Sequence, residues 1–365
     1  MLLCEPATAE KTPVVSGGFL FNRFLTEAAP QLLRRLRGTA AETAQAAAAA
    51  YEGDPDSAEA VIIDSLYWNI PGALPQFFAL LPADLPKVLL MHLPPGLTDD
   101  SNRSTAPPLP AGLGDLHWSR VIVPSRRVYE EYRNQLNVPV VICTPGMDHV
   151  QTDRTFAADP GTAAVVSSGE LKLLSVANWS RRKGIDLILD ALDDLWQRGL
   201  RNWSWTSVGN TAGDTEFGYM QRARIDAAPW GSHCRVLGTQ TPEQTARRRE
   251  QADLFVQMSR YETFGMALAE AVVCGLPIIA TRAGAAQEIC DSGAAVRLVD
   301  SDAGQLAGVL AEVLQDSRNH IQTLFPAESR GGQPLFSTWA ETAAGLYRDL
   351  TQATVSAAKG DGHGA

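Results

Sequence analysis

The sequence lacks an excess of positive charge, paired cysteines and long hydrophobic runs. Its 365 residues carry 31 Lys and Arg against 41 Asp and Glu, a formal net charge of -10. This balance argues against general nucleic-acid binding. The five cysteines are odd in number and widely spaced, without a CxxC pair, which is typical of reduced thiols in a cytoplasm. We therefore assign them neither a disulfide nor a metal.

No segment has the pattern of a membrane anchor. The longest apolar stretch, residues 267–280, contains Glu270, Gly275 and Pro277 and is too short to span a bilayer. The first six residues lack the basic and apolar regions of a secretory signal. We expect no integral membrane segment and a cytoplasmic location. The basic segment 32–37 leaves peripheral membrane contact open, although residues 1–150 hold 11 Lys and Arg against 16 Asp and Glu, a balance that disfavours anionic lipids.

The length suits two domains, and short β-like runs alternate with helical patterns throughout, which is typical of parallel sheets covered by helices. We predict domains at 1–155 and 165–325, a polar linker between them, a final helix at 334–350 and a disordered tail at 351–365. Residues 1–5 are a further candidate strand, whereas in residues 31–60 we expect a helix and an acidic turn and place no strand. The other predicted strands are 61–64, 87–92, 120–123, 138–143, 172–176, 204–208, 235–237, 253–257, 278–280 and 296–299.

Two glutamates, Glu262 and Glu270, flank a Phe-Gly step and are the best clue to function. A buried strand precedes them and a helix rich in Ala, Leu and Met follows. We expect Glu262 in the strand-to-helix loop and Glu270 about two turns into the helix. The helix start at Phe264, Gly265 and Met266 offers unpaired N–H groups and a positive dipole end, so it could hold a phosphate without a metal. The carboxylates would then be free to accept hydrogen bonds from sugar hydroxyls.

Three consecutive cations, Arg181, Arg182 and Lys183, follow the strand 172–176. Cations at the carboxyl end of a strand can clamp a diphosphate. The alternative is a solvated loop whose charges only keep the helix start soluble. Ligands of open α/β sheets bind at strand ends, so a second phosphate-friendly loop in the same domain favours the ligand site.

Two features of the first domain are weaker signals. Gly17 and Gly18 precede an apolar-periodic helix, and a double glycine lets a backbone approach a ligand, although it is also common in ordinary turns. His92 ends a hydrophobic strand. It could bond a sugar hydroxyl or act as a base, or it could be a histidine satisfied within the core. Both pairs of alternatives stay open at this point.

Together these segments resemble the GT-B-fold retaining glycosyltransferases of family 4, the glycosyl transferases group 1. The clearest likeness is the pair Glu262 and Glu270, which matches the two glutamates of the family's motif in spacing. The supporting matches are Ser16-Gly17-Gly18 with Asn22, His92, Thr144-Pro-Gly146-Met-Asp148, Lys183-Gly184, Val208-Gly209 and Val236-Leu237-Gly238.

The resemblance implies two Rossmann-like domains whose parallel sheets face a deep cleft, with a final helix that crosses back to the first domain. It implies a UDP- or GDP-sugar on the second domain, an acceptor from the first, and neither a cofactor nor a metal. By resemblance, the catalytic residues are Glu262 at the donor sugar, Lys183 at the leaving diphosphate together with Arg182, and His92 near the transferred sugar. Donor binding would involve Gly17, Gly18, Asn178, Arg181, Gly209, Leu237, Phe264, Gly265, Met266 and, at the ribose, Glu270.

One departure concerns Asn178, because family members commonly carry an arginine five residues before the lysine. A neutral amide cannot replace that charge, so donor activation must depend on Lys183 with Arg181 or Arg182. The function predicted is a retaining, metal-independent transfer of a sugar to a hydroxyl, preferably of a small soluble acceptor. The alternative is a non-catalytic nucleotide-sugar-binding or scaffold protein. An NAD enzyme is disfavoured, since no strand leads into GxGxxG. The oligomeric state is not predicted.

Overall fold

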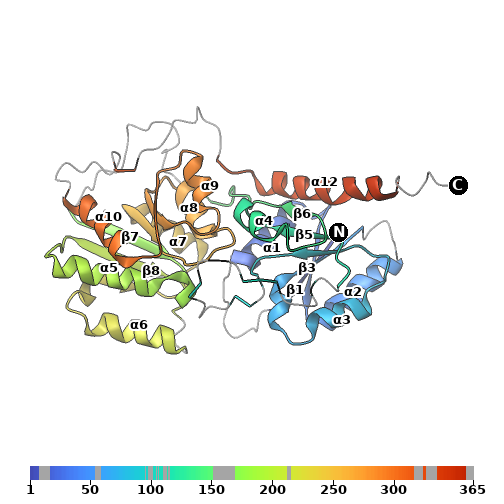
Figure 1. Cartoon of the computed structure of the whole chain (residues 1–365), viewed down its shortest axis with the longest axis horizontal. Coiled ribbons are helices and arrows are strands. Elements are labelled where there is room, and N and C mark those ends of the chain that lie inside the picture. The colour runs from blue at the N-terminus through green and yellow to red at the C-terminus, as the bar shows by residue number, and fades with distance from the viewer. Residues whose placement is uncertain are drawn as a thin grey trace. The chain divides into compact units, whose positions relative to one another are not determined.

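The computed structural model divides into two compact units, each described below by itself (Figure 1). It describes residues 1–7, 17–53, 59–94, 96–97, 102–103, 105, 107–109, 113, 116–150, 169–211, 215–315, 324–325 and 335–358. Unit 1 comprises Met1–Leu97, Ala106–Asp148 and Phe336–Ala365, and unit 2 comprises Thr98–Thr105 and His149–Leu335. The predicted linker lies almost entirely outside the described residues.

Unit 1 is built on a six-stranded parallel sheet in the order β2-β1-β3-β4-β5-β6. Every residue of β1, β3 and β4 is buried, which explains their nearly continuous apolar sequences, because helices cover both faces of such sheets. The strands are β1 Leu2–Pro6, β2 Arg34–Gly38, β3 Val61–Asp64, β4 Lys87–Leu90, β5 Arg120–Val123 and β6 Val140–Ile142. The helices are α1 Gly17–Ala28, α2 Ala40–Gly53, α3 Ala73–Leu80, α4 Arg126–Tyr132 and the 3-10 helix η2 Ser65–Asn69.

The last helix, α12 Trp339–Ala358, belongs to unit 1 and lies beside α1 (Figure 1). The Trp339 ring contacts Phe21 in an edge arrangement with ring centroids 5.4 Å apart. Its backbone N–H donates to Asp148 Oδ1 at 2.7 Å, and a side chain at Gly146 would fall on the Trp339 backbone. The segment 144–148 thus holds the start of this helix in place.

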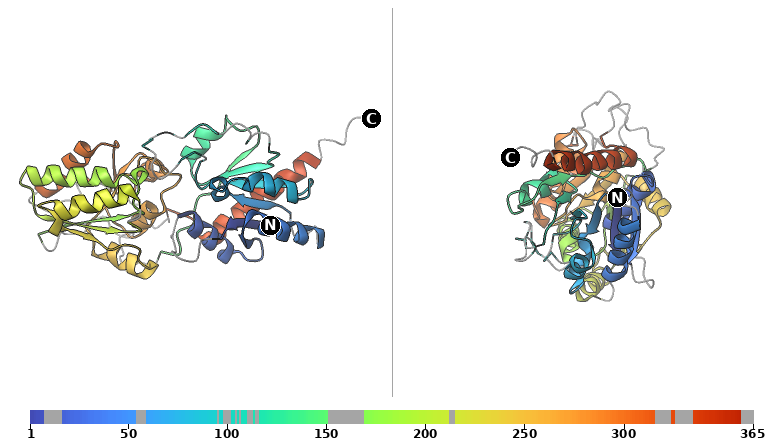
Figure 2. Two further views of the ribbon diagram at one scale, coloured as in Figure 1. Left: turned by 90° about the horizontal axis from the view of Figure 1, so that it is seen from below. Right: turned by 90° about the vertical axis from the view of Figure 1, so that its right-hand side faces the viewer.

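Unit 2 is built on a second six-stranded parallel sheet in the order β12-β11-β10-β7-β8-β9. In chain order this is the Rossmann arrangement, in which the first and fourth strands are neighbours. The helices lie on both faces of the sheet (Figure 2). The strands are β7 Leu171–Val176, β8 Trp203–Val208, β9 Cys234–Val236, β10 Leu254–Gln257, β11 Ile278–Thr281 and β12 Val296–Val299. The helices are α5 Ile185–Gln197, α6 Glu216–Ala227, α7 Pro242–Gln251, α8 Met266–Val273, α9 Ala286–Asp291, α10 Ala303–Gln315 and the 3-10 helices η3 Arg181–Lys183 and η4 Gly231–His233.

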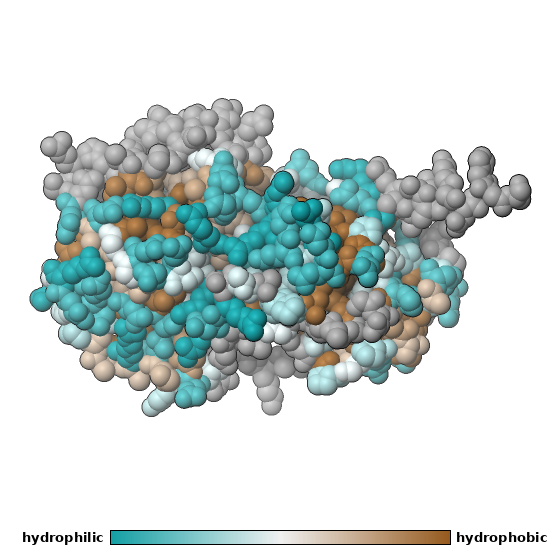
Figure 3. Space-filling model, viewed as in Figure 1, coloured by the Kyte–Doolittle hydropathy of each residue, from teal (hydrophilic) through white to brown (hydrophobic). Residues whose placement is uncertain are grey.

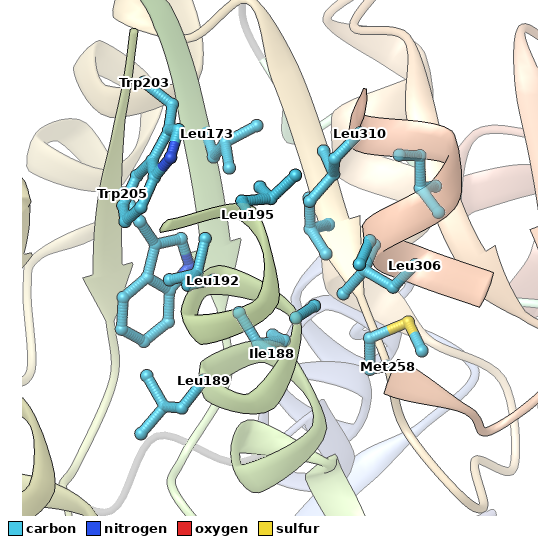
Figure 4. Close-up of a cluster of buried hydrophobic side chains, with 14 of the residues drawn as sticks. Leu173, Ile188, Leu189, Leu192, Leu195, Trp203, Trp205, Met258, Leu306 and Leu310 are labelled. Atoms are coloured by element: carbon cyan, nitrogen blue, oxygen red, sulfur yellow. The ribbon is translucent and has the colours of Figure 1, made fainter. Parts of the chain in front are cut away.

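The core of unit 2 forms where α5 and α10 pack against the sheet. Ile188, Leu192 and Leu195 of α5 recur at helical spacing and are buried, so one face of this helix is apolar. Figure 4 shows these side chains between Trp203 and Trp205 of β8 and Leu306 and Leu310 of α10. On the face seen in Figure 3, hydrophilic residues cover much of the surface and hydrophobic areas between them are smaller. No helix in the described ranges is long and apolar enough to cross a membrane.

Two predictions of secondary structure are wrong. The segment 31–60 does contain a strand, β2, at the edge of the first sheet. Its sequence, Arg-Arg-Leu-Arg-Gly, has no apolar run because an edge strand is only half covered. The second error is the tail, since α12 continues through Ala358 and residues 351–358 are helical. The remaining predicted strands are confirmed: three have the observed bounds, and the ends of the others differ by one or two residues.

Candidate active site

The candidate site of unit 2 lies at the carboxyl ends of β7 and β10. These two strands are neighbours in the sheet although three α-helices, two 3-10 helices and two strands separate them along the chain. The strand order reverses at this point, and ligands of open α/β sheets bind in the crevice that such a reversal creates. The loop after β7 carries the three cations and the loop after β10 carries Glu262. The topology therefore brings the two predicted loops together.

The cationic loop forms a 3-10 turn, η3, at residues Arg181–Lys183. Ser180 caps it by accepting the backbone N–H of Lys183 at 3.3 Å. Gly184 ends it with a φ of 67°, and a side chain there would collide with the carbonyl of Met258 in the neighbouring loop. Glycine is thus required both for the left-handed conformation and for the close approach of the two loops.

Lys183 and Glu262 form an ion pair between these loops, with Nζ 2.5 Å from Oε1. The same carboxylate accepts the hydroxyl of Ser259 at 2.9 Å. Burial by itself raises the pKa of Glu262, but the charges of Lys183 and Arg182 and the hydrogen bonds from Lys183 and Ser259 outweigh it, so the pKa is lowered. The site therefore holds a buried carboxylate in its charged form beside a half-buried ammonium.

Arg260 fastens the two loops to each other. Its guanidinium makes a bidentate pair with Asp186 at 2.8 and 2.7 Å and also donates to the carbonyl of Arg181 at 2.6 Å. Its backbone N–H donates to the carbonyl of Arg182 at 2.8 Å. Sequence reasoning missed Arg260 and Asp186, because an arginine and an aspartate 74 positions apart carry no local signal of being partners.

The helix start at Phe264, Gly265 and Met266 lies where it was predicted. Gly265 precedes α8 with a φ of 104°, and Met266 is the first residue of the helix. Phe264 is buried, and its carbonyl accepts the N–H of Ala285 at 2.8 Å. This contact holds the loop in place, so the first N–H groups of α8 keep a defined direction.

Glu270 differs from the prediction in two respects. It is the fifth residue of α8, a little over one turn from the start rather than two. Its carboxylate is also not free, because it pairs with Arg249 of α7 and lies 3.2 Å from His149 Nε2. Sequence reasoning missed Arg249 and His149. The sequence offered no local signal for Arg249, because it is the last of three consecutive arginines in a strongly polar helix.

Three further predicted residues line the turns after β7, β8 and β9. Asn178 Oδ1 accepts the N–H of Asn210 at 2.9 Å and so ties the β7 loop to the β8 loop. Gly209 donates to the carbonyl of Gly238 at 2.9 Å, and a side chain on it would collide with the Ala177 carbonyl. Leu237 is half-buried and its N–H donates to the Ser207 carbonyl at 2.9 Å.

Of the three cations, Arg181 is the exposed one, with its guanidinium carbon 5.4 Å from the centroid of the Phe217 ring. Arg182 is half-buried, and its Nη1 is 3.4 Å from the carbonyl of Tyr261. Lys183 is bonded directly to Glu262. The alternative of a merely solvated loop therefore fails for Lys183, although its predicted role at a diphosphate stays a prediction.

Gly17, Gly18 and His92 lie in unit 1. Gly17 opens α1, and a Cβ on Gly18 would lie 3.1 Å from the His92 ring. The His92 side chain is buried, with Nε2 2.8 Å from Asn22 Oδ1. Burial lowers the pKa of His92 to about 3. His92 is thus buried and hydrogen-bonded to a neighbouring side chain, as one of the two alternatives from the sequence predicted. Its predicted role at a substrate stays a prediction.

Residues 163–323 match the family of glycosyl transferases group 1. This segment belongs to that family. The group 1 segment contains every strand of the second sheet and all the loops of the site in unit 2. The described part of the chain holds no cluster of three or more His, Cys, Asp and Glu side chains arranged for a metal ion.

Curated relatives match about half of the chain. This chain is 28% identical over 181 residues to a D-inositol 3-phosphate glycosyltransferase of Corynebacterium jeikeium, and the match covers 49% of this chain and 43% of the relative. It is 28% identical over 216 residues to one of Pseudarthrobacter chlorophenolicus, covering 56% and 48%. The chain thus spans less than half the length of these two relatives.

Solved structures resemble the whole chain. Sucrose-phosphate synthase from Thermosynechococcus elongatus has a TM-score of 0.68 and 17% identity, covering 97% of this chain and 99% of that one. Anabaena HepE in complex with UDP-glucose has a TM-score of 0.68 and 15% identity, covering 98% and 100%. At these identities the likeness shows the fold, and the predicted GT-B class with two Rossmann-like domains is confirmed.

Proposed function

We propose that this chain is a glycosyltransferase that moves a sugar from a nucleotide-diphosphate sugar to a hydroxyl, with retained configuration and without a metal. The observation that carries the proposal is the Lys183–Glu262 pair at the strand reversal between β7 and β10. It lies inside the group 1 segment and beside the start of α8. A cation, a charged carboxylate and a helix N-terminus together suit a sugar attached to a diphosphate.

For the donor we propose a UDP-sugar. Anabaena HepE, which shares the fold, was solved with UDP-glucose. In our proposal the diphosphate lies against Lys183, Arg182 and the N–H groups at the start of α8. Glu262 accepts hydrogen bonds from the sugar hydroxyls, since its lowered pKa keeps it charged. Glu270, already directed by Arg249, would bond the ribose.

The proposed reaction separates charge between the sugar and the leaving group. The bond from the anomeric carbon to the diphosphate oxygen breaks, its electron pair leaves with the diphosphate, and the sugar becomes oxocarbenium-like. Lys183 and the dipole of α8 stabilise the negative charge that develops. The acceptor oxygen forms the new bond on the same face, and its proton passes to the leaving phosphate oxygen. Glu262 positions the sugar and does not attack it.

For the acceptor we propose a small soluble molecule. The two relatives described above are named for D-inositol 3-phosphate, so a phosphorylated polyol is the first class to test. Myo-inositol and its monophosphates, offered with UDP-sugars, would test this class directly. Transfer to an unphosphorylated or lipid acceptor instead would replace this part of the proposal and leave the donor part standing.

The proposal can be tested by measuring which nucleotide sugar raises the melting temperature, because a ligand that binds only the folded state stabilises it. We expect a rise with UDP-sugars, a smaller rise with UDP, and none with uridine. Lys183→Ala should abolish most of the effect of UDP, and Glu262→Ala should reduce the difference between UDP-sugar and UDP. If no nucleotide sugar changes the melting temperature, the proposed function is refuted.

A second candidate is a non-catalytic nucleotide-sugar-binding protein, and Asn178 is the observation that favours it. Its amide ties two loops together at a position where the family commonly has an arginine. Binding of UDP-sugar without transfer or hydrolysis would support this candidate. An Asn178→Arg variant should then raise the affinity for UDP, since it adds a cation at the proposed diphosphate.

A further inference from the structure

Unit 1 has a polar cluster at its own strand reversal. In the order β2-β1-β3-β4 the chain changes direction between β1 and β3, which is where open sheets of this kind form a crevice. Glu5 lies near the end of β1, Asp64 ends β3, His92 follows β4 and Asn22 is on α1. All four side chains are buried.

The Asn22 amide is oriented by two carboxylates. Its Nδ2 lies 2.8 Å from Glu5 Oε2 and 2.5 Å from Asp64 Oδ2. Glu5 is paired with Arg35 and Arg37, and its carboxylate only accepts hydrogen bonds, so the NH2 group must face Glu5 and Oδ1 must face the other way. Oδ1 lies 2.8 Å from His92 Nε2. An amide oxygen can only accept, and Nε2 must therefore carry the proton of this bond.

The residues around His92 hold its ring in place. The backbone N–H of His92 donates to Ser65 Oγ at 2.9 Å, the Phe21 ring lies edge-on at 5.0 Å, and a Cβ on Gly18 would lie only 3.1 Å from the ring. Asp64 Oδ2 is 3.6 Å from Nε2, too far for a hydrogen bond.

Among the described residues, the acidic side chains next to His92 are Asp64 and, through Asn22, Glu5. Glu5 is itself paired with Arg35 at 2.6 Å and Arg37 at 2.9 Å. Burial raises the pKa of Asp64 to about 7 and lowers that of His92 to about 3. At neutral pH the ring is therefore uncharged, and with its proton on Nε2 it has a lone pair on Nδ1.

We propose that Asn22 is a positioning residue that holds His92 in the neutral, Nε2-protonated tautomer, so that the ring offers Nδ1 as a hydrogen-bond acceptor. The ligand chemistry that fits such an atom is a donated hydroxyl. That the hydroxyl belongs to a sugar or to its acceptor rests on the proposed function, whereas the tautomer does not depend on it. The structure also gives Gly18 a role here, because it admits the ring to its place.

The tautomer can be measured in the full-length, ligand-free protein labelled with 15N in its histidine rings. Long-range 1H–15N correlation spectra distinguish a protonated from an unprotonated ring nitrogen, and the His92 signals are those lost in His92→Gln. We expect Nε2 protonated and Nδ1 unprotonated throughout about pH 6 to 8. In Asn22→Asp, a third carboxylate should raise the pKa of His92 and place a proton on Nδ1 at neutral pH. Asn134→Asp is the control, since it makes the same change at an exposed position of unit 1.

A proton on Nδ1 of the wild-type ring at neutral pH, or an equal mixture of tautomers, would overturn the proposal. So would a well-folded Asn22→Asp protein whose His92 signals equal those of the wild type. If that variant does not fold, the wild-type spectrum still decides. Because no nucleotide sugar is present, a failure here is distinct from a failure of the proposed function.

Discussion

Replacing Lys183 by methionine removes the charge that faces Glu262 and keeps an unbranched side chain of similar length. The Glu262 side chain is 9% exposed and that of Lys183 is 21% exposed. Breaking a buried ion pair by removing one partner costs about 3–5 kcal/mol. Ser259 still donates to the carboxylate and Arg182 is still close, and Lys183 is only partly buried. We therefore expect Lys183→Met to lower the free energy of unfolding by about 2–3 kcal/mol at neutral pH.

The loss should depend on pH in a defined direction. In the wild type the pKa of Glu262 is lowered on folding, so its contribution is present above its unfolded pKa of about 4.3 and is lost as the pH falls through the folded value. In Lys183→Met two of the lowering causes are gone and burial raises the pKa instead. Near neutral pH the variant then contains a buried charge on Glu262 that destabilises it, and protonation of Glu262 removes this charge. The difference in unfolding free energy between the wild type and the variant should therefore shrink as the pH falls towards about 4.5.

The measurement is a double-mutant cycle of Lys183→Met, Glu262→Gln and the combined variant. Urea unfolding is followed by tryptophan fluorescence, because Trp203, Trp205 and Trp230 are fully buried in unit 2. We expect the combined variant to lose less than the sum of the single variants, by at least about 1.5 kcal/mol. Lys172→Met is the control, since Lys172 lies on β7 of the same unit.

Two results would refute this reasoning. One is a coupling energy below about 0.5 kcal/mol, which is the level expected of independent sites. The other is a loss of unfolding free energy in Lys183→Met that is the same at neutral pH and at about pH 4.5. This would mean that removing the ammonium does not change the pKa of Glu262.

Three further predictions concern the contacts that hold the sites in place. Arg260→Lys should cost about 1–2 kcal/mol of unfolding free energy, because an ammonium cannot reproduce the bidentate pair with Asp186; an unchanged urea midpoint would contradict this. Gly146→Ala should cost about 1–3 kcal/mol, since its methyl would meet the backbone of Trp339; unfolding followed by the far-ultraviolet helical signal would reveal it, and wild-type stability would mean that α12 is not seated there. Burial raises the pKa of Asp64 to about 7, so the wild type should lose stability as the pH rises from about 5 to about 8. Asp64→Asn should flatten this loss, and equal slopes for both proteins would argue against a buried, partly protonated acid.

The sequence by itself determined the fold class and most of the strands. Runs such as Val61–Asp64 and Ile278–Thr281 are apolar throughout because both faces of a parallel sheet are covered, and this pattern is visible without coordinates. The strand β2 was missed because Arg34 to Arg37 lie on an edge, where the periodicity is weak and Arg35 and Arg37 are neutralised by a buried acid. That acid, Glu5, lies about 30 residues away along the chain.

The sequence also identified both loops of the unit 2 site, since glutamates around Gly265 and three consecutive cations are local patterns. Only the tertiary structure decided which groups meet. Lys183 bonds to Glu262 across 79 positions and Arg249 pairs with Glu270 across 21, distances at which spacing along a chain carries no information about contact. The physical reason is that parallel strand order, set by packing of the whole sheet, makes β7 and β10 neighbours and so brings their loops together.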